Sequence, residues 1–238
     1  MQIPLYFKKA LVTALLLAGA AAAGRAQAWE PVDQPWYVGA ALGSSLGQCT
    51  FRSMTEAQLH PGIQGGAFGG YRFNRLLSLE AGVQLGAQSQ QALDCCTYWL
   101  AEDGTRYLSP VLDETGWYYH DLDTRTQWGK LAFQVNADLL RLFMAPEGRW
   151  SLSVGPQIAA VTTKTKLVTP DKEIPYARQW HLGLGGQASL GYRISQGIGA
   201  SLYGGITCLT GERFDNLPQH AHKSNLIWEA GFRLSFYL

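Results

Sequence analysis

Apolar and polar residues alternate one by one along several stretches of the chain. In the clearest stretch, 225–238, all seven even positions are apolar and most odd positions are polar. Successive side chains of a strand point to opposite faces, so this period of two predicts a β-strand with one apolar face, whereas an amphipathic helix would repeat every 3.6 residues. The same alternation occurs at 77–85, 130–139, 150–158 and 182–193, and more weakly at 36–47, 63–73 and 198–208. The pattern therefore predicts eight strands.

The connections between these strands are alternately long and short. Compact turns are expected at 74–75, 146–148 and 195–197, and long loops at about 48–62, 89–125, 167–179 and 211–224. Even-stranded membrane barrels have short periplasmic turns and longer extracellular loops. We therefore predict an all-β protein, an eight-stranded antiparallel transmembrane up-and-down β-barrel with its apolar faces outward. The alternative is a soluble lipocalin-type barrel, which would turn its apolar side chains inward and carry more charges on its surface.

Composition favours the membrane barrel. Of the 238 residues 47% are hydrophobic and only 16% are charged, whereas about 25% of the residues of a soluble domain are charged. Beyond the N-terminus the chain has no run of about 20 apolar residues, as a membrane-spanning helix needs. The formal net charge of +1 gives no basic footprint for nucleic acid, so no nucleic-acid partner is expected.

The first 28 residues have the features of a secretory signal peptide. Lys8 and Lys9 precede the uncharged, Leu- and Ala-rich stretch 10–23, and Ala26-Gln27-Ala28 is an A-x-A cleavage site. An anchoring N-terminal helix is the alternative. We expect cleavage after Ala28 and a mature barrel domain over 29–238. Cleavage removes three basic residues and no acid, which leaves 16 bases against 18 acids and a net charge of −2.

The mature chain resembles the small outer-membrane β-barrel family, the OmpA/OmpX-like "porin family" barrels. The resemblance covers the whole mature chain and depends on the alternation and on the final strand, Trp228 to Leu238. It differs in ending on Leu238, where the family usually has Phe. The composition also looks like that of the Bacteroides-type branch. The resemblance implies a cell outer membrane location, contact with outer-membrane lipid, and assembly by the barrel assembly machinery.

An eight-stranded barrel is only wide enough for side chains to fill its interior. The predicted inward positions carry charges of both signs, and because an unpaired buried charge is costly, we predict a paired charge network in the lumen. Its members are Arg72, Glu80, Lys130, Asp138, Arg193, Glu229 and Arg233. Lys130 and Glu229 are expected near mid-height and the others in the periplasmic half, with inward glycines making room for the long side chains. A gated ion path is the alternative use of these charges.

Aromatic residues near the strand ends are expected to form lipid-facing girdles at the two membrane interfaces. These residues are Trp36, Tyr71, Trp128, Trp150, Trp180, Tyr192, Trp228 and Phe236. A role in stacking a ligand is the alternative.

The loop at 89–125 is the longest and is rich in acids and aromatic residues. We predict an interaction surface there, formed by Tyr98, Trp99, Trp117, Tyr118 and Tyr119. A loop of this length is often functional, and its acids and aromatics suit a protein partner, a glycan or Ca²⁺. Alternatively, the strands extend beyond the membrane and the aromatics pack a small extracellular cap.

Four cysteines remain after cleavage, in a compartment that permits disulfides. Cys49 is expected to pair with Cys95 or Cys96, while Cys208 lies on the lipid-facing register and is expected to stay free. A vicinal Cys95–Cys96 bond would strain the backbone. The four residues lack the C-x₂-C spacing of a zinc site, so no metal and no cofactor is expected.

His222 and Ser224 precede the last strand, which carries Glu229, and this stretch is similar to the His-x-Ser-Asn stretch of lipid A deacylase barrels. If the alternation of the last strand is extended back to these residues, His222 and Ser224 lie on the lipid-facing register, whereas Glu229 faces inward. The carboxylate that such an enzyme needs on a neighbouring strand is not evident. We therefore expect a non-enzymatic protein with a structural or interaction role through its extracellular loops, as a subunit of an envelope complex. A lipid A-modifying enzyme and a narrow porin-like channel are the alternatives.

Overall fold

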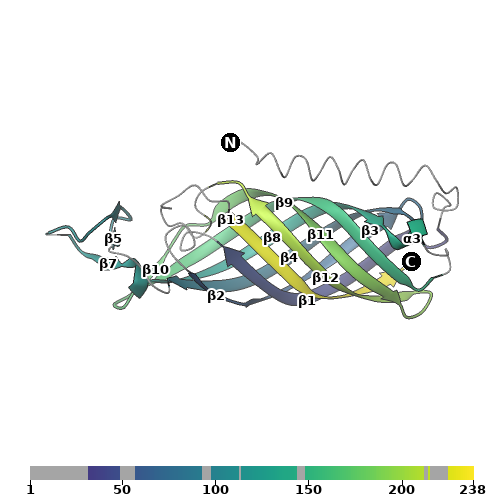
Figure 1. Ribbon diagram of the computed structural model, residues 1–238, viewed down its shortest axis with the longest axis horizontal. Coiled ribbons are helices and arrows are strands. Elements are labelled where there is room, and N and C mark those ends of the chain that lie inside the picture. Colours follow the sequence, from purple (N-terminus) through teal and green to yellow (C-terminus); the bar gives the residue numbers. More distant parts are fainter. Residues whose placement is uncertain are drawn as a thin grey trace.

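The computed structural model describes residues 32–48, 57–92, 98–112, 114–143, 148–211, 214 and 225–238. Eight long strands form the wall of a barrel: β1 (Trp36–Gln48), β3 (Gly62–Arg72), β4 (Leu77–Ala92), β8 (Asp123–Asp138), β9 (Trp150–Val168), β11 (Gln179–Arg193), β12 (Ile198–Leu209) and β13 (Asn225–Tyr237). The loop end adds β2 (Ala57–His60), β5 (Trp99–Ala101), β6 (Arg106–Tyr107), β7 (Gly116–Tyr118), a 3₁₀ turn (Tyr119–Asp121) and β10 (Glu173–Pro175). A short helix, α3 (Leu140–Phe143), lies at the opposite end (Figure 1).

The sheet closes on itself, which confirms the predicted eight-stranded antiparallel barrel. Each long strand pairs with its neighbour in the sequence, and the first strand, β1, pairs with the last, β13, from Tyr37 opposite Tyr237 to Gln48 opposite Leu226. The first tight turn depends on Asn74, whose side chain accepts hydrogen bonds from the backbone N–H groups of Leu76 (2.9 Å) and Leu77 (2.7 Å). At the same end the backbone N–H of Leu238 donates to the carbonyl of Trp36 (2.9 Å).

The outside of the barrel is an apolar belt. Leu42, Val83, Leu131, Phe133 and Leu202 are among its exposed residues, and all lie on the outward register. A soluble lipocalin-type barrel would turn these apolar side chains inward, so that alternative fails, and an apolar belt around a closed barrel is the surface that a membrane covers. At the turn end Trp36 packs edge-on against Tyr71, and Trp150 packs against Tyr192.

Trp128 does not belong to the girdle predicted for it. It is 3% exposed and lies on the inward face of β8, together with Lys130. The prediction was wrong because Trp128 has the parity of the polar face of its strand. A large aromatic residue near a strand end suggested a position at the membrane interface. The alternation along the strand, however, determines which face a side chain occupies, and it places Trp128 on the inner face.

The three longest strands extend past the membrane at the loop end. β4 and β8 each have 16 residues and β9 has 19, whereas a transmembrane strand needs about 9–11. The outward positions of the β8–β9 hairpin change from Phe133 and Leu131 to Gln127 and Arg125. Charged side chains on the outer face indicate that this part of the wall is in water and not in lipid. The two strands therefore leave the membrane near Gln127.

Among the described residues, no helix is long and apolar enough to cross a membrane. The predicted signal peptide, 1–28, lies outside the described residues, and cleavage after Ala28 stays a prediction.

Candidate functional site

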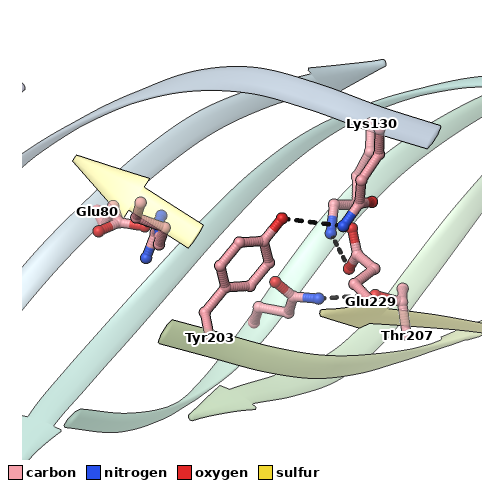
Figure 2. A network of polar contacts seen from close by, with 8 residues as sticks. Glu80, Lys130, Tyr203, Thr207 and Glu229 are labelled. Carbon is pink, nitrogen blue, oxygen red and sulfur yellow. Dashed lines mark hydrogen bonds and ion pairs between the residues drawn. The ribbon is translucent and has the colours of Figure 1, made fainter. Parts of the chain in front are cut away.

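A buried ion pair crosses the middle of the lumen. The ammonium of Lys130 on β8 donates to the carboxylate of Glu229 on β13, and both side chains are 1% exposed. The two strands are not neighbours in the sheet, so the contact spans the interior (Figure 2). Removing either partner would leave a buried unpaired charge, which is strongly destabilising.

A second ion pair lies toward the turn end. The guanidinium of Arg233 donates to Oε1 of Glu80, and the hydroxyl of Tyr37 donates to Oε2 of Glu80 at 3.1 Å. The Arg233 guanidinium also lies over the ring of Phe68, 3.9 Å from its centre, and 5.5 Å from the ring centre of Tyr203. These contacts place the charged group close to two aromatic rings, an arrangement that favours a guanidinium.

The other three predicted lumen charges lie at the turn-end mouth and do not join the two central pairs. Asp138 forms an ion pair with Arg141 of α3 at 3.3 Å. Arg72 and Arg193 both donate to Gln34, the former to its backbone carbonyl and the latter to its side-chain oxygen at 3.0 Å. The predicted single network is therefore two central pairs and separate groups at the mouth, because the strand stagger places the charges at different heights.

Inward glutamines were missed by the sequence interpretation. Gln64 donates to the hydroxyl of Tyr203 at 2.9 Å, and Gln157 donates to the hydroxyl of Thr207 at 2.7 Å. Gln84, Gln134 and Gln187 are also buried in the interior. The alternation along the sequence could have placed them in the lumen, because each glutamine occupies a position on the polar face of its strand. Their side chains fill the lumen without adding charge.

On the loop side of the Lys130–Glu229 pair the lumen holds an apolar cluster, beside buried polar residues such as Thr163, His181 and Thr207. We call this cluster the plug: Trp128, Ala159, Val161, Leu209, Phe214 and Ile227. Trp128 lies two residues beyond Lys130 on β8, and Ile227 lies two residues beyond Glu229 on β13. Ile227 and Val161 are fully buried. Apolar side chains offer an ion no ligands, so a charge within this cluster would be costly.

The turn end is open instead. A cavity of about 650 Å³, which we call the vestibule, reaches inward as far as Phe68, Glu80, Ser201 and Arg233. A second, much smaller pocket of about 20 Å³ lies deeper, beside Glu80 and Lys130. That volume admits about one water molecule. Described residues on the loop side of the Lys130–Glu229 pair contribute nothing to the lining of the vestibule.

The aromatics of the longest loop form a small core of their own. We call residues 98–122 and 167–176 the cap. Trp117, Tyr119, Leu100, Leu122 and Leu167 are buried together in it. The indole N–H of Trp117 donates to Asp171 at 3.0 Å, and Lys172 forms an ion pair with Glu102. In Figure 1 the cap lies beyond the barrel, around β5, β7 and β10.

This packing corrects the predicted interaction surface. Trp99, Trp117 and Tyr119 are 5%, 8% and 0% exposed, so they cannot contact a partner, whereas Tyr118 is 37% exposed and Tyr98 is partly buried against the core. The composition of the loop gave the aromatic residues but not which of them are buried. Sequence reasoning missed two exposed leucines, Leu108 (70%) and Leu112 (92%).

Several residues that the sequence suggested for a disulfide or a catalytic site lie outside the described part of the chain. They are Cys49, Cys95, Cys96, His222 and Ser224, and the proposed disulfide stays a prediction. Cys208 is half-buried, has a free thiol and follows the outward register of β12. Within the described ranges, no three His, Cys, Asp or Glu side chains lie close enough together to hold a metal ion.

The closed barrel and its apolar belt define the class, a small outer-membrane β-barrel. Neither a family model nor a curated protein sequence matches the chain. Among solved structures it is similar to Ail, the attachment invasion locus protein of Yersinia pestis, at 7% identity and a TM-score of 0.49 over 87% of this chain and 100% of that one. Neisserial surface protein A matches at 10% identity and a TM-score of 0.45, over 85% of this chain and 97% of that one.

OprG from Pseudomonas aeruginosa, an outer membrane protein, matches at 8% identity and a TM-score of 0.43, over 86% of this chain and 96% of that one. The expected likeness to small outer-membrane barrels is therefore confirmed, whereas the Bacteroides-type resemblance stays a prediction. At these identities and TM-scores the likeness carries no information about function.

Proposed function

We propose that this outer-membrane barrel is a non-enzymatic interaction protein that holds its cap outside the membrane to bind a protein partner in the cell envelope. The observation that carries the proposal is the construction of the cap. A loop with no binding role needs no core of its own, yet this one buries Leu100, Tyr119 and Leu122 together. A preorganised surface loses less conformational entropy on binding than a flexible loop does.

The exposed part of the cap is apolar in one place. Leu108 and Leu112 flank the segment Ser109-Pro110-Val111, and both are largely exposed on a structure that is otherwise packed. Large apolar side chains at the centre of a polar surface are typical anchors of protein interfaces. We assign the partner contact to these leucines together with Tyr118.

The lumen supports this assignment by disfavouring the alternatives. The plug is an apolar cluster on the loop side of Lys130, and an ion placed within it would be unfavourable, which argues against a channel. Glu229 is buried and paired with Lys130, so it is unsuited to lipid A chemistry on the outer face. Mass spectrometry of lipid A from cells with and without the gene tests the enzyme alternative, and a changed acylation pattern would replace our proposal.

The direct test is site-specific photo-crosslinking in living cells. We expect a photoreactive residue at Leu112 to give a discrete crosslinked product that mass spectrometry identifies as one envelope protein. The substitution Leu108→Ser on the same chain should weaken that product several-fold. The matched control is a photoreactive residue at Leu202, which is half exposed on the barrel wall and should crosslink only lipid.

Heat-modifiable migration on gels shows that each variant is folded. If correctly folded protein with the photoreactive residue at Leu112 gives no discrete product, or the same products as the Leu202 control, the interaction proposal is wrong.

A further inference from the structure

The vestibule has a large excess of positive charge. Its lining includes six arginines, Arg72, Arg75, Arg141, Arg149, Arg193 and Arg233, against three acids, Asp33, Glu80 and Asp138. Low-dielectric walls around a cleft with one sign of charge focus the field and raise the local concentration of counter-ions. Such a mouth attracts anions from the turn side.

Two of the three acids are already occupied. Glu80 accepts hydrogen bonds from Arg233 and from the hydroxyl of Tyr37. Asp138 pairs with Arg141, and its Oδ1 accepts from the backbone N–H groups of Leu140 (3.2 Å) and Leu152 (3.0 Å). These two carboxylates therefore do not neutralise Arg72 or Arg193.

Arg72 and Arg193 form the part of the vestibule that is built to hold an anion. Both guanidinium carbons lie over the ring of Tyr237, 4.7 and 4.5 Å from its centre. Both side chains are anchored by Gln34, and Arg193 also donates to the carbonyl of Gln196 at 2.7 Å. Among the described residues neither arginine has a carboxylate partner.

The buried guanidinium nitrogens give a second, independent indication. The Nε atoms of Arg72, Arg193 and Arg233 have no hydrogen-bond partner among the described residues. Arg233 is about nine-tenths buried and lies at the inner end of the vestibule. Buried donors require acceptors, and guanidinium groups fit carboxylate and phosphate oxygens in a two-point geometry.

We propose that the vestibule is a binding site for a small anion that carries two or more carboxylate or phosphate groups. Its volume of about 650 Å³ lies within the range of small-ligand sites. Two positive charges fixed on one ring favour a ligand with two negative groups over a monovalent ion. Because the plug closes the lumen beyond Lys130, the ligand enters and leaves on the turn side only.

The test is isothermal titration calorimetry on the mature protein in detergent at constant ionic strength. Tricarballylate is the multivalent carboxylate probe and pyrophosphate is the phosphate probe, with acetate and chloride as monovalent controls. We expect at least one multivalent probe to bind with one-to-one stoichiometry, and acetate and chloride to bind at least tenfold more weakly. The two multivalent probes distinguish a carboxylate ligand from a phosphate ligand.

Variants then locate the site. The double variant Arg72→Gln with Arg193→Gln should weaken binding at least tenfold, because each substitution removes charge-assisted hydrogen bonds to the ligand. Arg72→Lys keeps the charge but loses the planar fork, so it should cause an intermediate loss and serves if the glutamine variant fails to fold. Arg125→Gln is the matched control, since this arginine is exposed at the loop end, and it should leave the affinity unchanged.

Three results would overturn the proposal. They are no binding of either multivalent probe, equal binding of acetate or chloride, and full affinity in the folded Arg72→Gln and Arg193→Gln double variant. None of them bears on the cap, so the proposal can fail while the interaction function stands.

Discussion

The two halves of the lumen follow the same alternating pattern but are filled in opposite ways. On the loop side of the Lys130–Glu229 pair the inward residues include Trp128, Val161 and Ile227, which pack together in one apolar cluster. On the turn side they include arginines and serines around a cavity of about 650 Å³. One half is therefore a structural core and the other is an accessible site, although both are enclosed by the same barrel wall.

The difference shows that the inward face of a barrel strand is not a uniform environment. An apolar inward residue contributes to stability through burial, by roughly 1.5–3 kcal/mol for a large aliphatic side chain. A charged inward residue at an open mouth costs little because water reaches it. Substitutions in the two halves should therefore have different consequences, and the predictions follow in order of expected effect.

The largest effect is expected at the boundary between the two halves. Glu229→Gln leaves the Lys130 ammonium buried without its counter-charge and should lower the free energy of unfolding by about 3–5 kcal/mol. The double variant Lys130→Met with Glu229→Gln should recover most of that loss, because no unpaired charge remains. Urea unfolding in lipid vesicles measures both. A double variant as unstable as Glu229→Gln would show that the pair is not the cause.

The next effect compares truncations in the two halves. Ile227→Ala in the plug removes fully buried methylene groups and should cost about 2–5 kcal/mol. Ser201→Ala in the vestibule should change stability by less than about 0.5 kcal/mol. The same urea titration compares the two variants, and equal losses would remove the distinction between the halves.

A smaller effect is expected where the plug meets a glycine. A Cβ on Gly86 would lie 2.4 Å from the indole of Trp128, whereas a Cβ on Gly204 would meet its first neighbour at 3.8 Å. Gly86→Ala should therefore destabilise the barrel by about 1–3 kcal/mol, while Gly204→Ala should not. Thermal unfolding monitored by heat-modifiable migration tests this pair, and the packing argument fails if both variants behave alike.

The smallest effect concerns the cap and its pH dependence. Hydrogen bonds from the backbone N–H (2.7 Å) and hydroxyl (2.8 Å) of Thr105 lower the pKa of Asp103 below its usual value. These contacts are present above the unfolded-state pKa and are lost as pH falls through the lower, folded-state value. The amide NMR signal of Thr105 should titrate with that depressed midpoint and not in Asp103→Asn. A midpoint at or above the ordinary aspartate value would contradict the contact.

The alternation along the sequence predicted the eight strands, their faces and the tight turns at 74–75 and 195–197, whereas the turn predicted at 146–148 lies mostly outside the described residues. It placed Lys130 and Glu229 inside, but their pairing depends on the stagger of strands that are not neighbours, and no local pattern encodes that. Trp128 could have been placed correctly from parity alone. The burial of Trp117 in the cap could not, because it depends on Leu167 at the end of β9 and on Asp171 in the loop that follows β9.

The excess of arginine in the vestibule was also beyond the sequence interpretation. Arg75, Arg141 and Arg149 lie in or next to the turns, where a basic residue is ordinarily a solvated surface group. Closure of the barrel brings them to the same mouth as Arg72, Arg193 and Arg233. The charge of a cavity is a property of the closed fold and does not follow from any one segment.

The most direct test of the central claim is thiol accessibility on the single strand β12, where Ser201 lines the vestibule and Thr207 is fully buried beside the plug. Each is replaced by cysteine in a chain whose native cysteines are alanine, and oriented vesicles are treated with a membrane-impermeant maleimide from either side. We predict that Ser201→Cys reacts from the turn side only and that Thr207→Cys reacts from neither side. Labelling of Thr207→Cys from either side, or of Ser201→Cys from the loop side, would contradict a lumen that is closed at the loop end and open at the turn end.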